Sequence, residues 1–291
     1  MMKINQLPVR TFNKVGMNIA KVDYEPKEYK KIEVNESTVI EFDKPQDVEI
    51  NIALEQRKEA TVIMNYTSGD TLNVKTNVSL KKGSSLRLIQ IDSSKKNSRL
   101  INQVESVLNE EADMDMIQIL PGRGDVYSGC ITKLEGKNSR CTYDVAYLAC
   151  ADQKCDMNYV AQHIGKETVC DIDARGVLKE GAFKTLRATI DFKSGTAGSK
   201  GKENERVLLL GENIVNQSIP LILCTEEDVE GAHGSQIGGL ADDILLYFGS
   251  RGIDRSTAEK MISFGNFERL INRIKDEDIK KRTREMVLEV L

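Results

Sequence analysis

The chain has 291 residues, and its 41 lysines and arginines against 45 aspartates and glutamates leave a net charge of −4 at pH 7. This near balance of charge gives no basic surface for binding nucleic acid. The sequence also contains no run of about 18 apolar residues, the length needed to cross a membrane. Aromatic residues make up 5% of the chain and tryptophan is absent, which disfavours a carbohydrate-binding cleft lined by aromatic platforms.

Residues 1–46 form the first segment, and their apolar residues follow no regular period. The segment has no apolar core followed by a small-residue cleavage site, which a secretion signal requires. We therefore expect a cytoplasmic protein with neither nucleic acid nor a membrane as a partner. We interpret residues 1–46 as a lead-in segment that begins the first coils of the domain that follows.

Residues 47–239 alternate between turn signals and short runs in which apolar and polar residues alternate as in strands. The turn signals recur about every 14 residues with no helical pattern between them, which is typical of a repeat architecture with about 28 residues and two strands per coil. An up-and-down barrel or a propeller would also fit this spacing. The turn signals lie at residues 68–70, 82–84, 94–97, 109–111, 122–125, 136–138, 152–154, 165–167, 179–181, 194–196, 211–213 and 225–228.

Residues 240–291 carry no strand pattern and are predicted to form a C-terminal helical region of three or four short helices. Asp254 suits the N-cap of one helix, and Gly265 is placed to end it. The next turns present one apolar face. That face is formed by Phe267, Leu270, Ile271 and Ile274. It predicts a helical cap packed on the last coil, a docking surface for a partner, or both.

Two histidines are available for metal binding or acid–base chemistry. His163 ends a predicted strand, where a structural or surface role is common. His233 lies among the small residues of 230–234, which let backbone or a ligand approach closely. Cys224 precedes it by nine residues across a turn, so a thiolate and an imidazole could meet there and bind iron, zinc or copper(I). His233 and Cys224 are therefore the candidate metal ligands.

The six cysteines contain no Cys-x-x-Cys pair, which argues against a zinc ribbon or a thioredoxin-like motif. In a reducing cytosol they are expected to be free thiols, and a buried free cysteine acts as a small apolar residue. Cys130, Cys150 and Cys170 do not follow the turn period, so we do not expect them to stack as a cluster site. Phosphate-loop and nucleophile-elbow motifs are absent as well, so the sequence indicates a protein that is not an enzyme.

The segment 228–238 resembles the core signature of the SufB/SufD family of iron–sulfur cluster assembly scaffolds. Upstream, residues 203–210 and 218–220 resemble the family's approach to this segment. Downstream, residues 245–253 are similar to the family's Tyr-Leu-x-Ser-Arg-Gly-Ile stretch. These separated motifs occur in the family's order between about residues 201 and 267, which makes the resemblance specific.

The resemblance implies a right-handed parallel β-helix with flanking helices that forms a homodimer, or a heterodimer with a paralogue, through the β-helix. It also implies that the C-terminal helices dock onto an ABC-type ATPase subunit of the SufC kind, and that the chain itself binds no nucleotide. A transient iron–sulfur cluster would be held with His233 as a candidate ligand. The expected partner-docking residues in the matching stretch are Tyr247, Arg251, Gly252 and Ile253.

The chain also departs from the family pattern. Gly231 stands where D-type members often carry a cysteine, and Gly234 stands where B-type members usually carry a glutamate. The B-type cluster cysteine has no counterpart. Two alternative functions therefore stay open beside the scaffold: a structural partner of the ATPase that binds no cluster, and a carbohydrate-active enzyme built on a β-solenoid.

Overall fold

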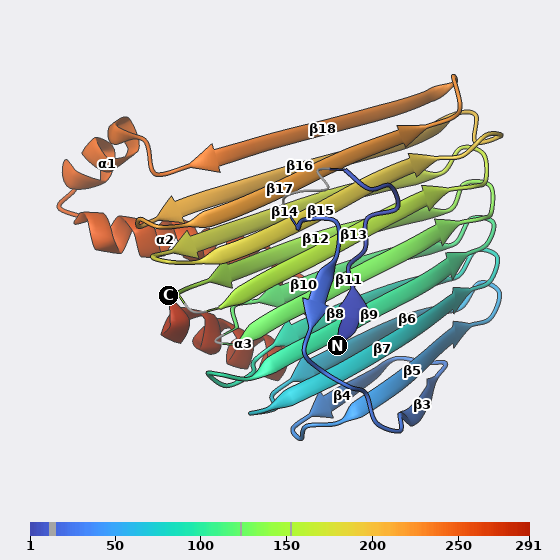
Figure 1. The fold of residues 1–291 in the computed structure, drawn as a ribbon, viewed down its shortest axis with the longest axis horizontal. Coiled ribbons are helices and arrows are strands. Elements are labelled where there is room, and N and C mark those ends of the chain that lie inside the picture. The colour runs from blue at the N-terminus through green and yellow to red at the C-terminus, as the bar shows by residue number, and fades with distance from the viewer. Residues whose placement is uncertain (12–15, 123, 152) are drawn as a thin grey trace.

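A computed structural model describes residues 1–11, 16–122, 124–151 and 153–291, and most of them form a parallel β-helix (Figure 1). Its strands alternate between two eight-stranded sheets, so that each coil contributes one strand to each sheet. The strands of both sheets pair in parallel with those of the coils before and after. The predicted β-solenoid is confirmed, and the barrel and propeller alternatives are wrong.

The two sheets divide the strands by odd and even number. The odd-numbered sheet consists of β3 (Lys30–Val34), β5 (Asp47–Leu54), β7 (Thr71–Leu80), β9 (Arg99–Leu108), β11 (Asp125–Leu134), β13 (Lys154–His163), β15 (Phe183–Phe192) and β17 (Val215–Cys224). The even-numbered sheet consists of β4 (Thr38–Phe42), β6 (Glu59–Tyr66), β8 (Ser85–Asp92), β10 (Asp113–Leu120), β12 (Arg140–Ala149), β14 (Val169–Lys179), β16 (Ser199–Leu210) and β18 (Val229–Gly238).

The strand register gives the length of a coil. Gln118 lies beside Gln90, which precedes it by 28 residues, so the predicted repeat of about 28 residues is confirmed. Alternate side chains of each strand point between the sheets, where they form one continuous core that runs from Val34 to Val207. Two of the predicted turns, those at 122–125 and 152–154, include Arg123 and Asp152, which lie outside the described residues.

The first coil, β3 with β4, lies inside the range that the sequence assigned to the lead-in segment. Ahead of it, β1 (Met2–Ile4) and β2 (Ala20–Val22) form an antiparallel pair that crosses the outer face of the odd-numbered sheet (Figure 1). Ile4, Ala20 and Val22 pack there against Ile101 and Tyr127. Residues 12–15 of the lead-in lie outside the described part of the chain.

Three helices follow β18: α1 (Asp242–Gly249), α2 (Arg255–Ile271) and α3 (Glu277–Val290). The side chain of Asp254 accepts a hydrogen bond from the backbone nitrogen of Thr257, so the predicted N-cap of α2 is confirmed. The predicted end at Gly265 is wrong, since α2 continues to Ile271. The apolar contacts of Phe267, Leu270 and Ile271 outweigh the cost of about 1 kcal/mol for one glycine inside a helix.

The predicted helical cap on the last coil is wrong. Instead α2 and α3 pack on the outer face of the even-numbered sheet, where outward-facing Ile89, Ile117 and Leu148 meet the apolar face of the helices. Ion pairs of Arg269 with Asp144 and of Arg273 with Asp115, both with 2.6 Å between nitrogen and oxygen, border this contact. Across the described ranges, no helix has the length and hydrophobicity needed to span a bilayer.

Candidate functional site at the open end of the β-helix

The last coil, β17 with β18, is an uncovered end of the β-helix. Within the described ranges each of these strands pairs on one side only, and β18 follows the rim of the molecule in Figure 1. Ile222 and Ile237, which sit on the inward-facing positions of this coil, are exposed. An unpaired sheet edge beside exposed apolar side chains is a surface suited to binding another protein.

One inward-facing column of side chains changes character as it reaches this end. From the N-terminal end it contains Val62, Leu88, Met116, Tyr143, Ile172, Glu203 and His233. The column is buried up to Glu203, whereas His233 belongs to the last coil and is exposed. Two groups that can bind metals or exchange protons therefore replace the apolar residues of the column in its last two coils.

Glu203 has an unusual environment for a carboxyl group. The residue is only 4% exposed, and its buried Oε2 atom accepts no hydrogen bond from the described residues. Burial, reinforced by repulsion from the nearby Glu205, raises the pKa of Glu203 from 4.5 to about 8. The sequence analysis did not single out this residue.

Glu205, two residues further along β16, is held by a buried ion pair. Its Oε1 atom accepts hydrogen bonds from the ammonium group of Lys184 and from the Tyr147 hydroxyl, the latter at 3.0 Å. Lys184 is completely buried and also donates to Ser218 Oγ at 3.1 Å and to the Gln217 carbonyl at 3.3 Å. The hydrogen bonds of Lys184 therefore go to groups other than Glu203, while its charge still opposes the rise in the pKa of Glu203.

Cys224 and His233 are not brought together. Gly231 faces Ile222, because a Cβ atom on Gly231 would lie 3.3 Å from Ile222 Cγ2. Strands β17 and β18 run in opposite directions (Figure 1), so Cys224 and His233 lie about four residues apart along the strands, which is about 13 Å. Cys224 is exposed at the end of β17, and its Sγ atom donates to the Glu226 carbonyl at 2.9 Å. Among the described residues, no group of three or more His, Cys, Asp or Glu is arranged to hold a metal.

The remaining cysteines discussed above and His163 have structural positions. Cys130 and Cys170 are buried in the core on different sheets, and Cys150 lies after the end of β12, so the prediction that these three do not stack is confirmed. Cys141 and Cys170, however, are neighbours in register, a pairing at the coil period that the sequence analysis missed. His163 is buried against Phe192, with ring centroids 4.5 Å apart, and burial lowers its pKa to about 4.

The expected partner-docking residues lie together after β18, where Tyr247, Arg251 and Gly252 are exposed and Ile253 is half-buried. All eight residues of α1 are described and none is buried; Tyr247 is 53% exposed and Leu246 is 75% exposed. The guanidinium of Arg251 lies 4.2 Å from the Tyr247 ring centroid, and Gly252 adopts a φ of +73° that lets Ile253 donate to the Phe248 carbonyl. Figure 1 shows α1 projecting away from the β-helix.

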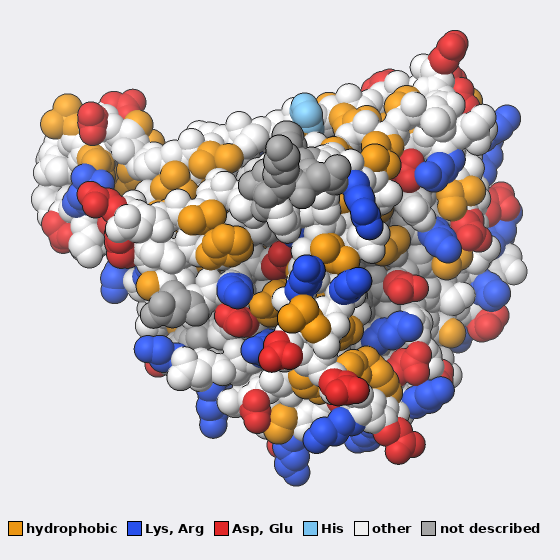
Figure 2. All heavy atoms as spheres, viewed as in Figure 1, with side chains coloured by type: hydrophobic (Ala, Val, Ile, Leu, Met, Phe, Trp, Pro, Cys, Tyr) orange, Lys and Arg blue, Asp and Glu red, His pale blue; other side chains and the backbone are white. Residues whose placement is uncertain are grey.

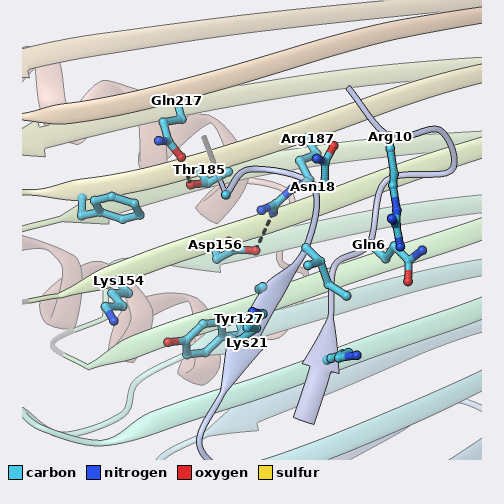
Figure 3. A pocket seen from close by; sticks show the side chains of 15 residues that line it. Gln6, Arg10, Asn18, Lys21, Tyr127, Lys154, Asp156, Thr185, Arg187 and Gln217 are labelled. Atoms are coloured by element: carbon cyan, nitrogen blue, oxygen red, sulfur yellow. Dashed lines mark hydrogen bonds and ion pairs between the residues drawn. The ribbon is translucent and has the colours of Figure 1, made fainter. Parts of the chain in front are cut away.

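A cavity of about 830 Å³ lies elsewhere, between the N-terminal strands and the outer face of the odd-numbered sheet. Within it Arg187 and Asp156 face each other (Figure 3), with 2.7 Å between Nη1 and Oδ1. Asn5 also donates to Asp156, and Arg187 Nε donates to the Met17 carbonyl at 2.6 Å. These contacts hold the N-terminal segment on the sheet, so the buried charges of this cavity serve the fold.

The face seen in Figure 2 carries lysine, arginine, aspartate and glutamate side chains interspersed with one another. A surface on which positive and negative side chains alternate produces no extended region of positive or negative electrostatic potential. It therefore adds no argument for a polyanionic partner on this face.

Comparisons with known proteins point to one family. The family model described as the SufBD core domain of the SUF system for FeS cluster assembly matches residues 41–266. The iron–sulfur cluster assembly protein SufD of Bacillus subtilis is 24% identical over 182 residues, which cover 62% of this chain and 42% of that protein. SufD of Escherichia coli is 21% identical over 244 residues, covering 80% of this chain and 56% of that protein.

A chloroplastic iron–sulfur cluster assembly SufBD family protein of Arabidopsis thaliana is also similar, with 24% identity over 144 residues, or 50% of this chain and 26% of that protein. The chain spans about half the length of the two SufD proteins that it matches. The matched range includes both Glu203 and His233, as well as α1.

Proposed function

Because the chain belongs to the SufBD core family of the SUF system for iron–sulfur cluster assembly, we propose that it is a non-catalytic scaffold that holds iron and sulfur at the open end of its β-helix. The observation that carries the proposal is the change from apolar residues to Glu203 and His233 in the last two coils of one inward-facing column. Imidazole suits iron, and the open end leaves room for cargo and for a second chain.

The partners proposed here are a second chain at the open end and an ABC-type ATPase subunit at α1 and the turn that follows it. A paired chain, either a copy of this one or a paralogue, would cover the unpaired edges of β17 and β18 and the exposed Ile222 and Ile237. Iron–sulfur clusters are held chiefly by cysteine thiolates. Since this chain places Cys224 away from His233, the cluster as cargo would need ligands from both chains.

Anaerobic reconstitution with iron and sulfide, in the presence of the ATPase subunit and nucleotide, tests this function. We expect the wild type to develop the visible absorption of a bound cluster, and His233→Ala and Cys224→Ser each to lose most of it together with acid-labile sulfide. Gln236→Ala is the control, because Gln236 lies on β18 in register with Arg206 and faces away from the column. A wild type that binds no cluster under these conditions would remove the scaffold proposal.

The ATPase partnership makes a separate prediction on α1. Replacing Leu246 by aspartate should weaken binding of the ATPase subunit at least tenfold, about 1.4 kcal/mol, because an apolar anchor would be replaced by a charge. The melting temperature should not change, since Leu246 is 75% exposed. Isothermal titration calorimetry measures the affinity, and Leu288→Asp on the exposed part of α3 is the matched control. Equal affinities for both variants and the wild type would exclude α1 as the docking element.

The placement of Cys224 favours a second candidate function, a structural partner of the ATPase that binds no cluster. Its thiol donates to a backbone carbonyl of its own turn instead of lying beside His233. The two functions predict different results in the same reconstitution. The structural partner would bind the ATPase subunit through α1 and take up neither iron nor sulfide.

A further inference from the structure

The cavity beside the N-terminal strands measures about 830 Å³ and opens on the outer face of the odd-numbered sheet, whereas the column that ends at His233 runs between the sheets. One wall of the cavity consists of described residues between positions 3 and 21. The other wall consists of outward-facing residues of β11, β13, β15 and β17. Protein pockets that hold small molecules commonly measure about 300–1,000 Å³, so this cavity is large enough for a metabolite.

The charges around this cavity are mostly positive. Its described lining contains one carboxylate, that of Asp156, and five cationic side chains: Lys3, Arg10 and Lys21 on the N-terminal wall, and Lys154 and Arg187 on the sheet wall. Arg187 is compensated by its ion pair with Asp156. The other four are exposed, and none of them forms an ion pair with a described residue. Four positive charges of the described lining are therefore left without an anion.

Neutral groups of the lining add hydrogen-bond donors. Thr185 Oγ1 donates to Oε1 of Gln217 at 2.8 Å, so the amide nitrogen of Gln217 remains as a donor for a ligand in the cavity that Gln217 lines. Burial raises the pKa of Tyr127 to about 12, which keeps its hydroxyl protonated and able to donate. Donors beside uncompensated cations suit an anionic ligand.

We propose that this cavity binds a small-molecule anion with two or more negative charges, which bridges the N-terminal wall and the sheet wall. Cations stand on both walls, and Figure 3 shows Arg10 and Lys154 on opposite sides of the cavity with Asp156 between them. Cations that are separated in this way favour separate negative groups on one ligand over a single carboxylate. Phe183, which is 37% exposed, offers an apolar contact to the remainder of the ligand. The site goes beyond the proposed function, since it involves neither iron nor the ATPase.

Isothermal titration calorimetry of the metal-free full chain, at constant ionic strength, tests the site with citrate and inorganic pyrophosphate as probes. The wild type should bind one equivalent of at least one probe, and the tighter probe identifies carboxylate or phosphate as the preferred group. Lys21→Gln and Lys154→Gln, one on each wall, should each weaken binding at least tenfold. Lys133→Gln is the matched control, because Lys133 is exposed on the same face of the sheet but does not line the cavity. Circular dichroism confirms that each variant is folded.

Hydrogen–deuterium exchange adds a readout that a purely structural lysine would not change. Because the ligand contacts both walls, a bound probe should slow exchange in β1 and β2 of the wild type, and the same probe concentration should have a smaller effect in Lys154→Gln. Three results would overturn the site: neither probe binds, Lys133→Gln weakens binding as much as Lys154→Gln, or exchange slows only in strands away from the cavity. Cluster reconstitution does not depend on these results, so either proposal can fail without the other.

Discussion

Lys184→Met is expected to lower the free energy of unfolding by about 3–5 kcal/mol, because it removes one member of a buried ion pair and leaves the other uncompensated. Lys184 has no exposed surface and donates to the Glu205 carboxylate. Without it, the only hydrogen bond left to the buried carboxylate of Glu205 from the described residues would be the one from the Tyr147 hydroxyl. The measurement is the shift in urea midpoint, together with the slope of the unfolding transition.

A second substitution separates the lost charge pair from lost packing. In the double variant Lys184→Met with Glu205→Gln, the amide can still accept from Tyr147 and no charge remains buried, so most of the lost stability should return. Lys200→Met is the matched control, because Lys200 forms an exposed pair with Glu230, with side chains 58% and 73% exposed. Exposed pairs contribute about 0–1 kcal/mol. Equal midpoints for Lys184→Met and Lys200→Met would contradict the prediction.

The coil architecture was predictable from the sequence because every coil repeats the same local signals. Turn residues separate runs of alternating apolar residues, and stacking of coils with similar lengths brings equivalent positions together, as for Gln90 and Gln118. The choice between a solenoid and a barrel depends on which strands pair. Strand pairing depends on contacts between coils, and the alternation of apolar and polar residues within one strand carries no information about those contacts.

The position of α2 and α3 was not predictable from the helical region alone. Its apolar face was recognised, but an apolar face does not say which surface receives it. The signal lies in the strands: around Leu88 and Ile89 apolar residues occupy both inward and outward positions. A strand that is apolar on both faces is buried on both faces, and the outer face of the even-numbered sheet is therefore the one that the helices cover.

The candidate site was predictable only in part. His233 could be chosen because small residues surround it, but residues 202–206 on β16 are polar at both odd and even positions. Alternation alone thus cannot decide whether Glu203 or Asn204 points inward. Comparison with the preceding coil decides it, since Glu203 lies beside the buried Ile172. The pairing of His233 with Cys224 was suggested by their closeness in sequence, and the opposite directions of β17 and β18 separate them.

The inward position of Glu203 leads to the last prediction, a loss of stability as the pH rises. The unfolded chain ionises this carboxyl near pH 4.5, whereas the folded chain keeps the proton up to about pH 8. Between these values the folded state binds more protons, so the free energy of unfolding should fall by about 4 kcal/mol from pH 5 to pH 8 in the metal-free protein. Urea unfolding across this range, after removal of metals with a chelator, measures the change.

Glu203→Gln isolates this contribution from those of the neighbouring Glu205, Lys184 and His233, which remain in both proteins. The amide keeps the shape of the protonated acid and does not titrate, so the variant should match the wild type near pH 5 and exceed its stability by about 4 kcal/mol at pH 8. Parallel pH profiles for the two proteins would contradict the prediction.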